Sequence, residues 1–176
     1  VMDDFINDEY NYTEIDEDMN IFFKGTFCGG DRIIHLNNFL PKTNSSDPIP
    51  FVFPVLRNNT YNLYISNIYY FEITVADEPF RDYWDDECIS VGFSINNYTN
   101  KNYQVGWLGG STGYHSDDGS IFINKKIKTN VDLWGPGDTI GCGVLFKKTY
   151  GNVFYTKNGK IVYFSDYKFI LDQYPF

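Results

Sequence analysis

The stretch GWLGGSTGYHSDDGSIF, residues 106–122, decides the fold of this chain. Small residues and aromatic residues alternate along it, and Asp118-Gly119 separates two short strand-like runs. A glycine after an aspartate can adopt the positive backbone angles that a tight reversal requires. The stretch therefore predicts two strands joined by a tight turn.

The composition of the whole chain also favours strands. Its 176 residues are 43% hydrophobic and 19% aromatic, which suits one domain with a sizeable core. The aromatic residues are mainly Phe (16) and Tyr (15), and these fit the half-buried surface of a sheet better than a helix. No segment shows sustained helical periodicity. We predict an all-β domain built as a sandwich of short strands.

Two segments have the period of a strand. In residues 69–75 and 139–146 every second side chain is apolar. In the second segment Gly141 and Gly143 share the opposite face, which allows a bulky side chain or another backbone to come close. The predicted core-facing residues are Tyr69, Phe71, Ile73 and Val75 in the first segment and Ile140, Cys142, Val144 and Phe146 in the second.

Asn158-Gly159 is the strongest hairpin signal, because a two-residue type I′ turn favours this dipeptide. Both faces of the resulting hairpin are largely apolar, so we expect it to be central and covered on both sides. A second hairpin is expected from residues 51–56 and 61–65 around a polar turn. The Asn158-Gly159 turn predicts the pairs Lys157 with Lys160, Thr156 with Ile161, Tyr155 with Val162, and Phe154 with Tyr163.

The net charge of −9 is concentrated at one end of the chain. Residues 1–20 hold eight acidic residues and no Lys or Arg, which leaves 15 acidic against 14 basic residues elsewhere. We expect a poorly ordered acidic arm over residues 1–20 and a single domain over residues 21–176. No basic patch suited to nucleic acid is present. No apolar run approaches the roughly 20 residues of a membrane helix.

Three cysteines, Cys28, Cys88 and Cys142, are widely spaced and odd in number. They form no CxxC pair, and no Cys/His spacing suggests zinc, so the spacing predicts free thiols and no metal site. The acidic N-terminal residues differ from the basic and then apolar pattern of a secretory signal. We expect a reduced intracellular protein, located in the cytoplasm or the nucleus.

Residues 114–118 place His115 beside two carboxylates, a combination that can also form a metal or acid–base site. The set is too small for a metal site and lacks a calcium-loop pattern. We interpret the two aspartates as shaping a turn and His115 as bonding locally. The alternative, metal-assisted hydrolysis at His115, Asp117 and Asp118, would require bound metal. No catalytic triad elbow, phosphate loop or cofactor motif is found, so neither an enzyme nor a cofactor is predicted.

The side chains best suited to contacting a ligand are large aromatics with a polar group, namely Trp107, Tyr114 and Trp134. Aromatic residues mostly pack inside sandwiches, so Tyr114 and Trp134 are expected in the core. Trp107 follows a polar loop and precedes Leu108-Gly109-Gly110. We expect Trp107 to be exposed on the rim of a site.

Five motifs, in order along the chain, resemble those of the SPRY domain in the branch typified by Ran-binding protein M. The similarity covers residues 51–175, with Ser116 in place of the family's usual glycine. The sequence stops where family members continue into a further strand, so we expect either that it is a fragment or that the last strand is absent and leaves an edge open. The motifs are YYFEI (69–73), ISVGFS (89–94), GYHSDDG (113–119), GDTIGC (137–142) and FYTKNG (154–159).

The resemblance implies a twisted sandwich of two antiparallel sheets that binds proteins without catalysis. Family ligands are short protein segments held by loops on one face. By position, the resemblance assigns ligand contacts to Arg57, Asn59 and Trp107, and less directly to Tyr98 and Asn102 in an adjacent loop. It implies an adaptor or scaffold that recruits a protein partner, for instance to a ubiquitin-ligase or chromatin complex.

A carbohydrate-binding module is the alternative function. Lectin-like sandwiches share this architecture, and Trp and Tyr can stack on sugars. The lack of a secretion signal counts against it. A glycan array together with a protein pulldown would separate the two functions.

Overall fold

The computed structural model describes residues 11–15, 21–25, 51–76, 88–94, 103–147, 150–166 and 169–170. The chain divides into two compact units, residues 1–39 with 99–103 and residues 40–98 with 104–176. In the first unit β1 (Asn11–Ile15) and β2 (Ile21–Gly25) form an antiparallel pair. Strand β1 lies within the expected acidic arm, and the other residues of that arm are outside the described part of the chain.

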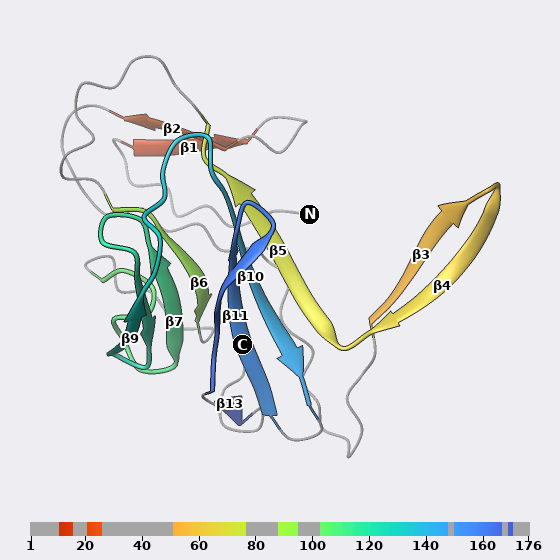
Figure 1. The fold of residues 1–176 in the computed structure, drawn as a ribbon. Helices are drawn as coiled ribbons and strands as arrows, with labels where there is room; N and C mark the ends of the chain where they lie inside the picture. The colour runs from red at the N-terminus through yellow and green to blue at the C-terminus, as the bar shows by residue number, and fades with distance from the viewer. Residues whose placement is uncertain are drawn as a thin grey trace. The chain divides into compact units, whose positions relative to one another are not determined.

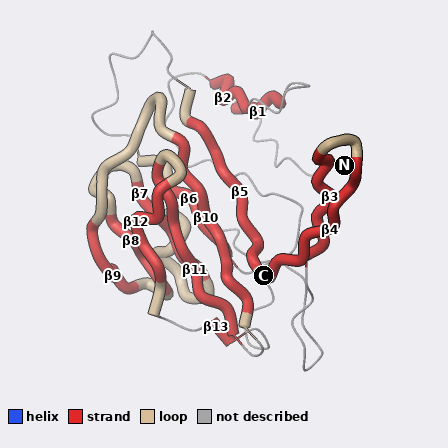
Figure 2. The backbone as a smooth tube through the Cα atoms, turned by 45° about the vertical axis from the view of Figure 1, so that its right-hand side comes forward, coloured by secondary structure: helices blue, strands red, loops and turns tan. Residues whose placement is uncertain are grey.

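The described strands of the second unit form three antiparallel sheets (Figures 1 and 2). A two-stranded sheet consists of β3 (Phe51–Arg57) and β4 (Thr60–Ser66). A five-stranded sheet has the order β12-β11-β10-β5, with β13 (Phe169–Ile170) also pairing with β11. Its other strands are β5 (Ile68–Thr74), β10 (Thr139–Phe146), β11 (Tyr150–Lys157) and β12 (Lys160–Phe164). The third sheet contains, in order, β6 (Ser90–Ser94), β7 (Ser111–His115), β8 (Ser120–Ile123) and β9 (Lys126–Asn130).

The two larger sheets pack face to face around one core. The rings of Tyr114 and Tyr155 meet at 5.8 Å, and the Tyr155 hydroxyl shares a 2.9 Å hydrogen bond with Thr112. On the β5 side, the rings of Phe71 and Phe93 meet edge-to-face at 5.6 Å. These contacts confirm the predicted all-β sandwich of two antiparallel sheets. The buried core is Val91, Phe93, Tyr114, Ile121, Ile123, Trp134, Ile140, Cys142, Val144, Phe146, Val153 and Tyr155.

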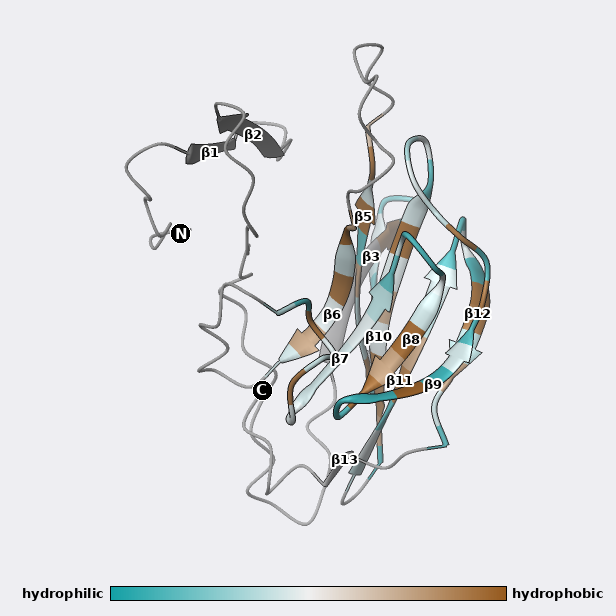
Figure 3. Ribbon diagram, turned by 90° about the vertical axis from the view of Figure 1, so that its left-hand side faces the viewer, coloured by the Kyte–Doolittle hydropathy of each residue, from teal (hydrophilic) through white to brown (hydrophobic). Residues whose placement is uncertain are grey.

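The predicted strand faces are confirmed. The apolar face of β10 is buried, and the alternation along β5 and β6 is visible as bands in Figure 3. The glycines on the other face of β10 are covered by side chains of neighbouring strands. The ring of Phe154 occupies the space beside Gly143. The Tyr70 hydroxyl occupies the space beside Gly141. The close approach expected at both glycines therefore occurs.

The turn predictions hold at the level of backbone angles. Asn158 and Gly159 have φ of 50° and 75°, as a type I′ turn requires. Asn58 and Asn59, between β3 and β4, have φ of 50° and 57°. Gly119 has φ of 68° at the reversal between β7 and β8. Asn and Gly tolerate this left-handed region better than other residues, which is why these positions form turns.

Two expectations for the β11–β12 hairpin were wrong. A bulge between Tyr155 and Thr156 shifts the register, so Tyr155 pairs with Tyr163 and Phe154 with Phe164. Strand β12 also lies at the end of its sheet among the described strands, and Phe164 is 46% exposed. The apolar residues on the outer face stack on each other. The Phe154 ring lies parallel to those of Tyr70 and Phe164, at 5.7 and 6.2 Å.

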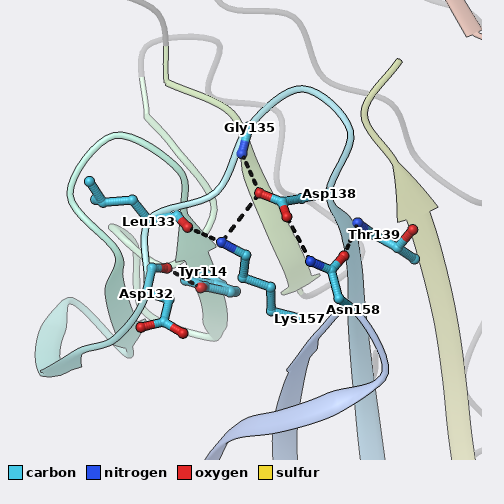
Figure 4. A network of polar contacts seen from close by, with 8 residues as sticks. All are labelled: Tyr114, Asp132, Leu133, Gly135, Asp138, Thr139, Lys157 and Asn158. Carbon is cyan, nitrogen blue, oxygen red and sulfur yellow. Dashed lines mark hydrogen bonds and ion pairs between the residues drawn. The ribbon is translucent and has the colours of Figure 1, made fainter. Parts of the chain in front are cut away.

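The motifs at residues 137–142 and 154–159 meet at one end of the sandwich (Figure 4). The carboxylate of Asp138 accepts hydrogen bonds from the Gly135 amide at 3.1 Å and from Asn158 Nδ2 at 2.8 Å, and lies 3.3 Å from Lys157 Nζ. The Asn158 side-chain carbonyl accepts from the Thr139 amide at 2.9 Å. This network holds the β9–β10 connection against the β11–β12 turn.

Within the described part of the chain, no helix has the length and apolar character of a membrane span.

Candidate binding site

Residues 104–110, which we call the Trp107 loop, lead into β7. Hydrogen bonds tie the middle of this loop to two other segments of the sheet. The Gly106 amide donates to Ser111 Oγ at 2.9 Å, and the Gly106 carbonyl accepts from the Lys125 amide at 3.0 Å. The loop is thereby anchored to the start of β7 and to the β8–β9 turn, so its shape is fixed before any ligand arrives.

The Trp107 side chain is half packed and half open. Its ring centroid lies 5.6 Å from that of His115 and 6.2 Å from that of Phe122. The residue is nevertheless 42% exposed, which confirms the expected exposure. An indole supported from below and open above offers apolar surface and an N–H donor at little entropic cost.

The support under Trp107 depends on a close backbone approach. The Val105 carbonyl lies against Gly113, where a β carbon would overlap it. The same carbonyl accepts the Nε2–H of His115 at 2.8 Å. Burial lowers the pKa of His115, and the opposing effects of this hydrogen bond and of the nearby aspartates do not offset it. The imidazole is therefore neutral at pH 7, and it is almost fully buried.

The two aspartates of the β7–β8 turn have different partners. Asp118 accepts from the Ser120 amide and hydroxyl, both at 2.7 Å, which is the turn-shaping role expected from the sequence. Asp117 Oδ1 instead accepts from the Cys88 thiol at 3.2 Å. Burial and the Asp117 carboxylate raise the pKa of Cys88 to about 12. Cys88 is therefore a protonated thiol in the absence of another ligand.

The predicted site residues fall in three places. Trp107 lies on its loop beside the four-stranded sheet, and Arg57 and Asn59 are exposed at the tip of the separate β3–β4 sheet. Tyr98 and Asn102 lie outside the described residues. For all five predicted site residues, the part in ligand binding stays a prediction. As expected, Tyr114 and Trp134 are buried in the core.

Sequence reasoning missed the residues that position Trp107 and those that meet beside it. Neither the packing of Phe122 against Trp107 nor the contact between Cys88 and Asp117 has a local signal. Cys88 and Asp117 are 29 residues apart and come together only because β6 pairs with β7. The local signals for a site here were the aromatic and glycine content of residues 106–122 and the two carboxylates next to His115.

The SPRY domain model matches residues 68–176, which is more than half of the chain. The chain belongs to the SPRY domain family. The match begins after the β3–β4 hairpin, so Arg57 and Asn59 precede the matched segment of this SPRY domain. Trp107, His115 and Asp117 lie within it.

The relatives contain this domain within much longer chains. Human SPRY domain-containing protein 3 is 36% identical over 97 residues, covering 53% of this chain and 21% of its own length. Human Ran-binding protein 9 is 37% identical over 97 residues, covering 52% of this chain and 12% of its own. A crystal structure of a human SPRY domain aligns over 55% of this chain and 59% of its own, with 30% identity and a TM-score of 0.44. SPRY domains are in general protein-interaction modules without catalytic activity.

Proposed function

We propose that this SPRY domain is a non-catalytic adaptor or scaffold that binds a short segment of a protein partner. The Trp107 loop is the centre of the proposed site. The other predicted ligand contacts are Arg57, Asn59, Tyr98 and Asn102. The observation that carries the proposal is the exposed Trp107 indole on a loop that the domain itself holds in shape.

Three physical features support a peptide ligand at this loop. Trp is among the residues most enriched at the centres of protein interfaces. The loop is anchored by hydrogen bonds, so little conformational entropy is lost when a partner docks. Lys125 in the β8–β9 turn anchors the loop through its amide, and its exposed side chain adds a cation to the rim.

We also propose a cellular compartment and a type of assembly for the domain and its partner. The two described cysteines, Cys88 and Cys142, are free, which suits a reducing compartment such as the cytoplasm or nucleus. Because relatives contain the domain as a small part of a longer chain, we propose recruitment to a larger assembly, such as a ubiquitin-ligase or chromatin complex.

The test is affinity capture from lysate of the native cells, with wild type, Trp107→Ala and Phe164→Ala compared side by side. Phe164 is a matched control, since it is a half-exposed aromatic on the other sheet. We expect partners captured by wild type and by Phe164→Ala to be lost with Trp107→Ala. A peptide from such a partner should then bind wild type at least about tenfold more tightly than Trp107→Ala.

Equal capture by all three proteins would contradict the Trp107 site. Arg57→Ala and Asn59→Ala would then test the hairpin tip. Capture of no protein, with binding on a glycan array, would replace the proposal with the carbohydrate-binding alternative.

A further inference from the structure

Three side chains with metal-binding chemistry meet beside the Trp107 loop. They are Cys88, before β6, His115, at the end of β7, and Asp117, in the β7–β8 turn. One donor atom from each lies within 4.8 Å of the other two. The Cys88 thiol already donates to Asp117 at 3.2 Å. The spacing of these residues in the sequence predicts no metal site, and only the pairing of β6 with β7 brings them together.

Two hydrogen bonds between Ile89 and Ser116 hold together the backbone segments that contain the three residues. The Ile89 amide donates to Ser116 Oγ at 2.8 Å, and the Ser116 amide donates to the Ile89 carbonyl at 2.9 Å. These reciprocal bonds join the residue after Cys88 to the residue between His115 and Asp117. The donor set is therefore preorganised by the sheet and does not depend on a free loop.

His115 makes the kind of hydrogen bond to a backbone carbonyl that metal-binding histidines usually make. Its Nε2–H donates to the Val105 carbonyl at 2.8 Å, and a carbonyl can only accept, so the remaining ring nitrogen carries the free electron pair. Backbone carbonyls that accept from a histidine in this way fix the tautomer and orientation of the ring in metal sites. The rings of Trp107 and Phe122, at 5.6 and 4.6 Å, further restrict rotation of the imidazole.

We propose that Cys88, His115 and Asp117 form a binding site for Zn²⁺. Thiolate, imidazole and carboxylate are the donors that zinc takes in proteins, and three protein ligands leave one position for water or a partner's group. Zinc bonds of about 2.0 to 2.3 Å require donor atoms roughly 3.3 to 3.8 Å apart. Cys88 Sγ and Asp117 Oδ1 are already 3.2 Å apart, and every other donor separation is within 4.8 Å, so only small side-chain movements are needed. Asp117 is exposed and gives the ion a path from solvent.

Coordination changes the hydrogen bonding of the cluster in a defined way. The S–H bond of Cys88 breaks, its proton passes to the buffer, and the thiolate bonds to the ion. Asp117 loses the thiol hydrogen bond and gains the metal bond. Because the Trp107 ring contacts His115, the ion binds next to the side chain at the centre of the proposed peptide site.

The test uses the untagged full chain, freed of metal with a chelator and titrated with Co²⁺ as a coloured substitute for Zn²⁺. We expect a saturable thiolate-to-cobalt charge-transfer band and tetrahedral d–d bands at one equivalent, both displaced by Zn²⁺. Calorimetry with Zn²⁺ should give the same stoichiometry. Asp117→Asn and Cys88→Ser should each weaken Zn²⁺ binding by at least about tenfold, and Cys88→Ser should abolish the charge-transfer band.

Two matched variants serve as controls. Asp118→Asn makes the same charge change in the same turn, but its carboxylate is bonded to Ser120, so it should retain Zn²⁺ affinity within about threefold. Cys142→Ala removes a buried thiol on β10 of the other sheet and should keep the charge-transfer band. Circular dichroism confirms that each variant is folded.

Three outcomes would overturn the proposal. The first is a folded wild type with no saturable cobalt spectrum. The second is a charge-transfer band that survives Cys88→Ser. The third is equal weakening by Asp117→Asn and Asp118→Asn, which would show an acidic turn attracting cations without a built site. None of these outcomes bears on the peptide-binding proposal, because they are measured without a partner.

Discussion

The ring of Phe154 fills the space beside Gly143 where any other residue would place its β carbon. The two residues face each other on neighbouring strands, in the pair Gly143 with Phe154 of β10 and β11. Phe154 is only 8% exposed although it lies on the outer face of its sheet. The missing side chain at Gly143 thus lets the aromatic ring lie flat across β10, between Tyr70 and Phe164.

Gly143→Ala should destabilise the domain. The added methyl group overlaps the Phe154 ring, which is stacked on both sides and cannot move aside freely, so we expect a loss of about 2 kcal/mol in the free energy of unfolding. Gly135→Ala is the matched control, because nothing lies within 4 Å of the added carbon there. Urea denaturation followed by circular dichroism measures both, and equal stability of the two variants would contradict the packing argument.

Tyr114→Phe should cost about 1 kcal/mol of stability, the usual net value of a hydrogen bond. The Tyr114 ring is fully buried, and its hydroxyl donates to the Asp132 carbonyl in the β9–β10 connection (Figure 4). Phenylalanine keeps the ring contacts and removes only this bond. Tyr61→Phe alters a side chain that is 71% exposed and should change stability by less than about 0.5 kcal/mol. If the denaturation curves of wild type and Tyr114→Phe coincide, the hydrogen bond does not contribute to the stability of the domain.

Asp138 should make the stability of the domain depend on pH in the acid range. Burial opposes its ionisation, but hydrogen bonds from Asn158 and Gly135 and the Lys157 ammonium outweigh it and lower the pKa of Asp138. A carboxyl with a lowered folded-state pKa contributes stability above its unfolded pKa and loses it as the pH falls through the folded value. Asp138→Asn should therefore be less stable than wild type at pH 7, with the difference shrinking below about pH 4.

Thermal melts of Asp138→Asn and wild type between about pH 2.5 and pH 7, a range that spans the usual carboxyl pKa values, test this. Asp166→Asn makes the same charge change at an exposed residue and is the control. A stability difference for Asp138→Asn that is the same at every pH would mean that the lost contacts are not linked to ionisation.

Cys88 should react slowly with iodoacetamide in metal-free protein. With a pKa raised to about 12, only about one thiol in 10,000 is a thiolate at pH 8. Asp117→Asn removes the carboxylate that helps to raise the pKa, so alkylation should be roughly three to ten times faster. Asp118→Asn should leave the rate unchanged. Peptide mapping by mass spectrometry measures modification at Cys88 alone, and an Asp117→Asn rate equal to that of wild type would refute the assigned cause.

Much of the fold could be predicted because it depends on contiguous residues. The Asn158-Gly159 turn, the buried face of β10 and the close approach at Gly141 and Gly143 all follow from backbone angles and a side-chain period of two. The exposure of Trp107 also follows from its neighbours in the chain.

The rest was decided by tertiary structure. Packing introduces the bulge between Tyr155 and Thr156 and makes β12 an edge strand among the strands described, which no local pattern encodes. The contact between Cys88 and Asp117 depends on the pairing of β6 with β7. Their positions in the sequence do not indicate that these two residues lie close together in space. Local propensity determines which strands and turns form, whereas which side chains meet depends on how those strands pair and pack.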